Sequence, residues 1–157
     1  MFKILILGLP ASGKSTAAQK LSQAFKITHV EADKYFWNSE GLQENNKMFI
    51  EKIVQILNQN ESWILEGHFK TLRSHIPKKM DSIILLDYPY PVVLYRWFKR
   101  SIKIFDFSDW RWLILKSRIL RQNYEKAILD YADQGVKVMR IKNTATAIED
   151  IISELKN

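Results

Sequence analysis

The stretch from Gly8 to Ser15 reads Gly-Leu-Pro-Ala-Ser-Gly-Lys-Ser and fills the phosphate-loop pattern G-x-x-x-x-G-K-[ST] at every position. Glycines at both ends let the backbone curl so that its N–H groups point inward at an anion. An apolar run of strand length, 2–7, precedes the pattern, and apolar residues at helical spacing follow it. Since phosphate binding requires this order of strand, loop and helix, the sequence predicts a nucleoside triphosphate site. The alternative, an ordinary glycine turn between two core elements, is disfavoured by that context.

Two residues of the pattern, Lys14 and Ser15, have predicted chemical roles. Lys14 reaches the outer phosphates as a point charge, and the Ser15 hydroxyl ligates the metal ion. The sequence therefore predicts a nucleoside triphosphate and Mg2+ as the ligands of this loop. The predicted nucleotide-binding residues are Gly8, Leu9, Pro10, Ala11, Ser12, Gly13, Lys14, Ser15 and Thr16.

Length and composition narrow the class of protein. With 157 residues and 46% hydrophobic residues, the chain is predicted to form one domain, 1–157, that buries roughly two thirds of its unfolded surface. Disulfides and cysteine-ligated zinc are excluded because the sequence has no cysteine. No apolar segment approaches the length of a membrane span, so we expect no membrane partner and a cytoplasmic location.

The net charge of +7 is concentrated in one region, 91–126, which carries nine basic and three acidic residues, an excess of six. Six Trp and Phe residues lie among these charges. The partner of this region is therefore predicted to be anionic. A solvated helix face is the alternative, and a surface that binds nucleic acid is a further one.

Apolar runs and helical spacing alternate along the chain. Strands are predicted at 2–7, 27–30, 62–65, 82–86 and 136–141, and helices after the phosphate loop, at 45–59, after Pro91, at 112–131 and after 146. The run 83–86 has no polar residue, which suits a parallel strand buried on both faces. The predicted fold is α/β, a three-layer, doubly wound, five-stranded parallel sheet.

Acidic residues follow three of the predicted strands. Glu31 and Asp33 come after the second strand, Glu66 after the third and Asp87 after the fourth. Ligands of such a sheet gather beyond the carboxyl ends of its strands, so we expect these carboxylates to converge around magnesium and a phosphoryl acceptor. The alternative is that each carboxylate caps the helix after its strand. His29 and His75 have no partner at metal-binding spacing, so no histidine metal cluster is predicted.

Taken together, these segments resemble the small P-loop kinases of the adenylate kinase and shikimate kinase group. The likeness is closer to the bacterial topology modulation proteins, which are adenylate-kinase-related. It rests on 8–16, on Ala32-Asp33-Lys34-Tyr35-Phe36-Trp37, on Trp63-Ile64-Leu65-Glu66-Gly67-His68-Phe69, and on the segments 83–89 and 95–100. The resemblance implies a P-loop kinase-like fold and ATP-dependent phosphoryl transfer to a small-molecule acceptor such as a nucleoside, nucleotide or hydroxy compound.

The resemblance also implies roles for individual residues. Ser15, Glu31 and Glu66 are the predicted metal residues, and Asp33 accepts or orients the acceptor hydroxyl. Asp33, Trp37, Gly67, His68 and Arg73 are the predicted acceptor-binding residues. A structural hydrogen bond is the alternative role for His68, and packing of a small helix is the alternative for the aromatic run 35–37. A short lid is expected within about 100–125, and Arg96, Arg100, Arg118 and Arg121 are the candidates that close over the phosphates.

The chain departs from this family pattern in two places. His68-Phe69-Lys70 stands where nucleotide kinases have Phe-Pro-Arg, and 104–109 is short for a lid. Two alternatives to a kinase therefore stay open. One is a nucleic-acid-associated ATPase or switch that uses the basic region 91–126, and the other is a nucleotide-binding protein without kinase activity.

Overall fold

A computed structural model describes residues 1–36, 45–67, 72, 75–76, 80–104, 110–142 and 147–156, with the backbone alone at 103–104, 110–115 and 147. The strands are β1 (Lys3–Gly8), β2 (Thr28–Glu31), β3 (Trp63–Glu66), β4 (Ser82–Leu86) and β5 (Lys137–Ile141). The helices are α1 (Lys14–Phe25), α2 (Asp33–Phe36), α3 (Asn46–Gln59), α4 (Tyr90–Ile104), α5 (Trp110–Ala132) and α6 (Ala147–Lys156).

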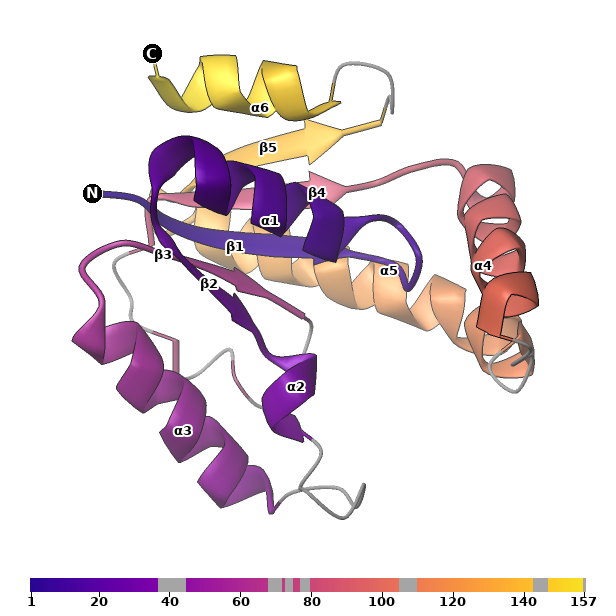
Figure 1. Cartoon of the computed structure of the whole chain (residues 1–157), viewed down its shortest axis with the longest axis horizontal. Helices are drawn as coiled ribbons and strands as arrows, with labels where there is room; N and C mark the ends of the chain where they lie inside the picture. The colour runs from indigo at the N-terminus through magenta and orange to yellow at the C-terminus, as the bar shows by residue number, and fades with distance from the viewer. Residues whose placement is uncertain are drawn as a thin grey trace.

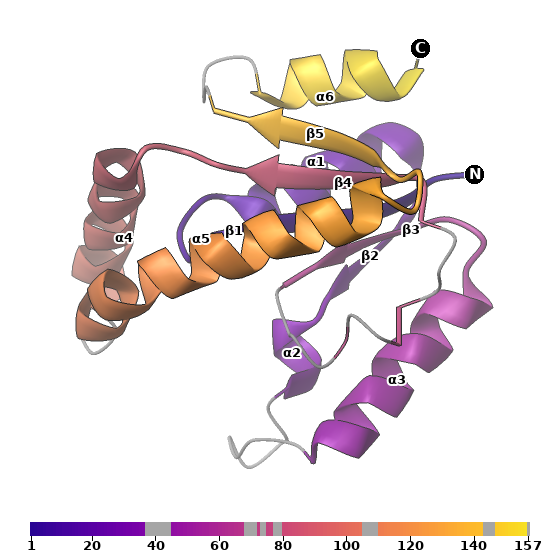
Figure 2. The same cartoon turned by 180° about the vertical axis from the view of Figure 1, so that it is seen from behind.

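All five strands are parallel and form one sheet in the order β2-β3-β1-β4-β5. Helices α1 and α6 cover one face of this sheet, and α5 runs along the other (Figures 1 and 2). The predicted α/β fold with a five-stranded parallel sheet and flanking helices is therefore confirmed. The short α2, at the end of β2, is a turn of helix that apolar spacing does not reveal.

The core lies on both faces of the central strands. Every residue of β3 and β4 is buried, and Trp63 is completely inaccessible. Burying a large apolar side chain stabilises a fold by about 1.5–3 kcal/mol, so these continuous apolar strands are held at the centre of the sheet. Strand β2 forms an edge of the sheet, and Val30 is the one buried residue among its four.

The strand register brings the functional segments to one end of the sheet. Gly8 pairs with Leu86 at the carboxyl ends of β1 and β4, and Glu31 pairs with Glu66 at the ends of β2 and β3. Helix α4 lies beyond this end, as both views show (Figures 1 and 2). Within the described residues, the helices are all too short or too polar to cross a lipid bilayer.

Candidate nucleotide and metal site

The loop between β1 and α1 has a backbone shape that suits an anion. Gly13 at φ 92° and Ala11 at φ 60° take left-handed conformations, and the Ser12 N–H donates to the Leu9 carbonyl at 3.0 Å. Gly13 is also the N-cap residue of α1, and the first turn of that helix has no acidic residue. Because no side chain caps this helix, its first amides and the positive end of its dipole remain available to phosphate groups.

Lys14, the first residue of α1, lies within electrostatic range of several charged side chains. Its Nζ donates a 3.0 Å hydrogen bond to the Leu9 carbonyl, back across the loop. Burial lowers the pKa of Lys14, while the nearby carboxylates of Glu66 and Asp33 raise it. The positive charge of Arg100 contributes a smaller lowering of this pKa. Lys14 thus belongs to a cluster of positive and negative groups at the mouth of the loop.

Ser15 and Glu66 meet at the carboxyl end of β3. The Ser15 hydroxyl donates to Oε2 of Glu66 at 3.0 Å, and only 3% of Glu66 is exposed. The other oxygen, Oε1, lies 3.4 Å from Nε2 of His29. Among the described residues, both of these atoms are buried without a hydrogen-bond partner. Burial raises the pKa of Glu66, and the hydrogen bond from Ser15 opposes that rise.

This pair has the chemistry of a magnesium site. Mg2+ takes oxygen ligands and usually binds through one or two protein groups, with phosphate oxygens and waters completing the shell. A serine hydroxyl beside a carboxylate with one unsatisfied oxygen fits that requirement. In the part of the chain that the structure describes, no three His, Asp or Glu side chains converge to bind a metal by themselves. A metal here would therefore depend on the nucleotide for further ligands.

Asp33 and Glu31 lie at the end of β2 but have different environments. The Glu31 carboxylate pairs with Lys34 at 2.7 Å. Asp33 is the first residue of α2; desolvation raises its pKa, and the positive charge of Lys14 lowers it. Asp33 is therefore a carboxylate within electrostatic range of the lysine of the loop.

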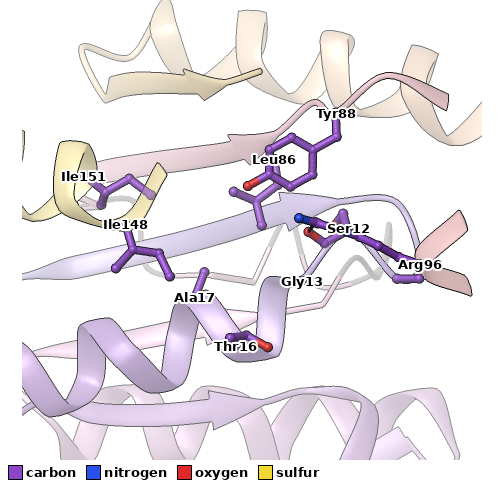
Figure 3. Close-up of a pocket in the computed structure, with 10 residues that line it drawn as sticks. Ser12, Gly13, Thr16, Ala17, Leu86, Tyr88, Arg96, Ile148 and Ile151 are labelled. Carbon is purple, nitrogen blue, oxygen red and sulfur yellow. Dashed lines mark hydrogen bonds between the residues drawn. The ribbon is translucent and has the colours of Figure 1, made fainter. Parts of the chain in front are cut away.

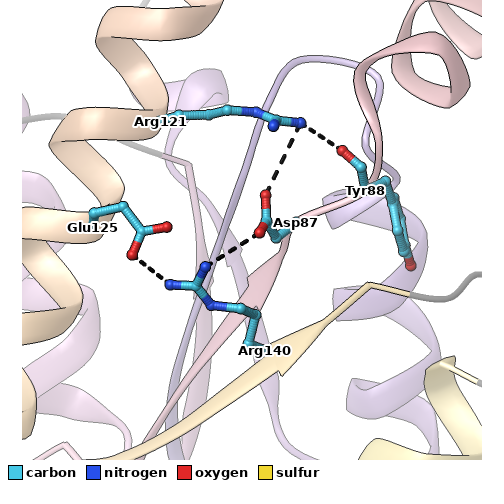
Figure 4. Close-up of polar contacts among 5 residues, drawn as sticks. All are labelled: Asp87, Tyr88, Arg121, Glu125 and Arg140. Atoms are coloured by element: carbon cyan, nitrogen blue, oxygen red, sulfur yellow. Dashed lines mark hydrogen bonds and ion pairs between the residues drawn. The ribbon is translucent and has the colours of Figure 1, made fainter.

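Asp87 does not join these carboxylates, which corrects the expectation that all four converge. Strand order explains the difference, because β1 separates β4 from β3 and β2. The Asp87 carboxylate contacts Arg140 at 3.3 Å and Arg121 at 4.0 Å, and Arg140 also pairs with Glu125 (Figure 4). This cluster ties α5 to the ends of β4 and β5.

The four predicted arginines have different surroundings. Arg96 donates through Nη1 to the Ser12 carbonyl at 3.0 Å, and its guanidinium lies 4.7 Å from the centre of the Tyr88 ring. Arg121 donates to the Tyr88 carbonyl at 2.6 Å. Arg100 and Arg118 are exposed on α4 and α5. The structure thus brings Arg96 onto the loop, and Arg100 into its electrostatic range, while Arg121 supports the segment after β4.

A pocket of about 390 Å³ opens beside the loop (Figure 3). Its walls come from the loop, α1, the end of β4, α4 and α6. Apolar side chains of Ala17, Ile148 and Ile151 line one part, and Tyr88 and Arg96 line another. A planar, mostly apolar group attached to a phosphate chain would fit such a cavity.

Sequence reasoning missed three residues of this region. His29 lies beside Glu66, Tyr88 lies under Arg96, and Tyr124 donates from α5 to the Gly8 carbonyl. The alternation of β2 places His29 on the same side of the strand as Glu31, which is the one signal that was available. Of the predicted acceptor residues, Gly67 is buried with φ 114°. Trp37, His68 and Arg73 lie outside the described residues.

Comparison with known proteins found a curated relative, a solved structure of similar fold and a matching family profile. The chain is 31% identical to the uncharacterized protein YqaC of Bacillus subtilis (strain 168) over 98 residues, which is 59% of this chain and 53% of that protein. The chain thus spans about half the length of the curated relative it matches. The structure superposes on an unliganded sugar kinase from Janibacter sp. HTCC2649 with a TM-score of 0.64 and 15% identity, covering 99% of this chain and 95% of the other.

The superposition shows that the fold is kinase-like. A family profile described as AAA domain matches residues 4–111, which include the phosphate loop, Asp33, Glu66 and the strands β2, β3 and β4. Since this match spans more than half of the sequence and contains the phosphate loop, the chain belongs to the AAA domain family.

Proposed function

We propose that this protein is a magnesium- and ATP-dependent kinase that phosphorylates a small-molecule acceptor. The observation that carries the proposal is the Ser15–Glu66 hydrogen bond at the mouth of the loop, within electrostatic range of Lys14. That arrangement would supply an anion site, a cation site and a charge-neutralising lysine at one point. We also propose that the protein belongs to the topology modulation group, but the proposed mechanism does not depend on that membership.

Backbone amides of 9–15 would hold the β- and γ-phosphates, and Lys14 would neutralise charge that shifts between them. Ser15 and Glu66 would hold magnesium, Ser15 directly and Glu66 directly or through water. When bound, magnesium neutralises the phosphates and orients them for in-line attack. The pocket next to Thr16 and Ala17 would accept the nucleoside part of ATP.

Asp33 would act on the acceptor. The acceptor hydroxyl oxygen forms a bond to the γ-phosphorus while the bond from the γ-phosphorus to the β,γ-bridging oxygen breaks, and ADP leaves. The hydroxyl proton passes to a carboxylate oxygen of Asp33. A raised pKa makes Asp33 a stronger base than an ordinary aspartate, which suits that transfer. Arg100, whose charge acts on Lys14, would stabilise the charge that spreads over the transferred group.

Two measurements test the proposal. Titration calorimetry should show Mg-ATP binding to the wild-type protein and a loss of about tenfold or more in Lys14→Ala, because a charge-assisted contact is removed. A screen of nucleosides, nucleotides, sugars and hydroxy acids should then find an acceptor that stimulates ADP release. Equal affinity in a folded Lys14→Ala protein would reject the phosphate site, and binding without stimulation by any acceptor class would reject the kinase.

One observation favours a second candidate, a nucleic-acid-associated ATPase. Tyr95, Phe98 and Ile102 are exposed along α4, beside the basic Lys99, and α4 contains no acidic residue. Exposed rings and basic groups are the features by which proteins hold single-stranded nucleic acid. Salt-dependent retention on single-stranded DNA or RNA at physiological ionic strength would support this candidate.

A further inference from the structure

Helix α5 contacts the first residue of the phosphate loop through Tyr124. The Tyr124 hydroxyl donates a buried 2.9 Å hydrogen bond to the carbonyl of Gly8, the first residue of the loop. Tyr124 itself is 4% exposed. One helical turn earlier, Arg121 donates to the carbonyl of Tyr88 at 2.6 Å and lies near the Asp87 carboxylate (Figure 4). Two side chains of one helix thus satisfy backbone carbonyls at the ends of β1 and β4.

Helix α4 completes the chain of contacts. Tyr88 carries the guanidinium of Arg96 over its ring, and Arg96 donates to the Ser12 carbonyl inside the loop (Figure 3). The contacts therefore run from Gly8 through α5 to Tyr88, and from Tyr88 through α4 back to Ser12. These contacts form a closed ring that joins the phosphate loop to α4 and α5.

The start of the loop is closely packed against Ser12 and the end of β4. A Cβ atom placed on Gly8 would lie 2.6 Å from the Ser12 Oγ and 3.0 Å from the Leu86 carbonyl oxygen. A buried carbonyl that loses its partner costs free energy, so removing the Tyr124 hydroxyl favours any loop conformation that turns the Gly8 carbonyl elsewhere. The amides that face a phosphate would turn with it.

We propose that Tyr124 and Arg121 are positioning residues of the nucleotide site, which hold the loop and the Tyr88–Arg96 pair in the shape that binds phosphate. This proposal rests on the proposed function and deepens it. Tyr124 acts through the Gly8 carbonyl, and Arg121 acts through Tyr88. Nucleotide affinity thus depends on the Tyr124 hydroxyl, which contacts the loop from α5.

The first test compares Tyr124→Phe with Tyr131→Phe. Tyr131 is a buried tyrosine two turns further along α5, so both variants lose one hydroxyl from the same helix. We expect Tyr124→Phe to weaken Mg-ATP binding about five- to tenfold in calorimetry, and Tyr131→Phe to stay within twofold of the wild type. Equal affinities for Tyr124→Phe and the wild type, with both folded by circular dichroism, would overturn the proposal.

Arg121→Met supplies an independent variant at a partly exposed position, and it keeps the test valid if Tyr124→Phe fails to fold. A double-mutant cycle of Tyr124→Phe with Arg96→Ala then tests the ring. If Tyr124 and Arg96 acted independently, the effects of the two substitutions would multiply, whereas a coupled ring should depart from the product by threefold or more. Multiplicative effects in the cycle, or an Arg121→Met protein that binds like the wild type, would count against the ring.

Hydrogen exchange separates this proposal from the proposed function. In the nucleotide-free protein, the amides of segment 8–15 should exchange about fivefold faster in Tyr124→Phe than in Tyr131→Phe. A wild-type protein that binds no Mg-ATP would reject the proposed function, and the exchange rates would still decide whether Tyr124 positions the loop. Unchanged exchange in Tyr124→Phe would reject the positioning role.

Discussion

The hydroxyl of Ser15 on α1 donates a hydrogen bond of 3.0 Å to Oε2 of Glu66, the last residue of β3 and 51 positions away along the chain. The carboxylate of Glu66 is buried, and its second oxygen has no hydrogen-bond partner within the described residues. That second oxygen lies 3.4 Å from Nε2 of His29, and a buried carboxylate that accepts one hydrogen bond carries a desolvation cost that a cation would offset. The proposed magnesium site would explain why an acidic residue ends a strand that is otherwise wholly apolar.

Glu66→Gln should separate nucleotide binding from its dependence on magnesium. Glutamine keeps the size of the side chain and can still accept from Ser15, but it lacks the charge that binds a cation. We expect affinity for ATP in EDTA to stay within about twofold of the wild type, and affinity for Mg-ATP to fall about tenfold. Titration calorimetry with and without magnesium measures both. If magnesium raises the ATP affinity of Glu66→Gln as much as that of the wild type, Glu66 is not part of the metal site.

Glu66 also predicts how stability depends on pH in the metal-free protein. Because burial raises its pKa in the folded state above the ordinary 4.5, the folded protein binds this proton more tightly than the unfolded chain does. The free energy of unfolding should therefore fall as pH rises from about 4.5 through the raised pKa, and Asp33 acts in the same direction. Urea denaturation in EDTA across this range should show a flatter profile for Glu66→Gln. Parallel profiles would contradict the prediction.

Asp33→Asn should affect transfer rather than nucleotide binding. Asparagine cannot take the acceptor proton, so turnover is expected to fall roughly 10²–10⁴-fold while affinity for Mg-ATP is kept. Single-turnover kinetics together with calorimetry would measure the two quantities. If the variant instead loses Mg-ATP binding and keeps transfer, Asp33 belongs to the metal site and Glu66 becomes the candidate on the acceptor side.

Arg100 and Lys99 are adjacent, exposed basic residues on α4. The charge of Arg100 lowers the pKa of Lys14. We expect Arg100→Ala to lower turnover about 10²-fold or more with little change in Mg-ATP affinity, because its charge acts mainly as phosphoryl charge redistributes. Lys99→Ala is the matched control and should leave turnover within about twofold. Equal losses of nucleic-acid binding in both variants, with turnover intact in both, would favour the second candidate function instead.

Gly8→Ala should destabilise the fold through close contact. Its Cβ would meet the Leu86 carbonyl oxygen at 3.0 Å, and a backbone atom in a central strand cannot move aside cheaply. We expect a loss of about 1–3 kcal/mol in the free energy of unfolding. Gly135→Ala is the control: it has φ 79° and open space around it, so it should cost only backbone strain, about 1 kcal/mol. Denaturant titration of both variants decides whether the larger loss falls at Gly8.

Local sequence determined the phosphate loop and the elements around it. The glycines at 8 and 13, the lysine after the second of them and the helix that begins there depend on neighbouring residues alone, so a pattern of eight positions identifies them. The strands were also predictable, because continuous apolar runs such as 83–86 suit only strands that are covered on both faces. For the same reason, the α/β class followed from the alternation of strands and helices.

The partners of the polar side chains were decided only by the tertiary structure. Glu66 meets Ser15 and His29, Asp87 turns to Arg140, and Tyr124 reaches Gly8 across 116 positions. Each contact depends on the strand order β2-β3-β1-β4-β5 and on the face that α5 covers. Periodicity shows that a strand is buried but not which strand lies beside it, because pairing between distant segments is set by the packing of the whole sheet.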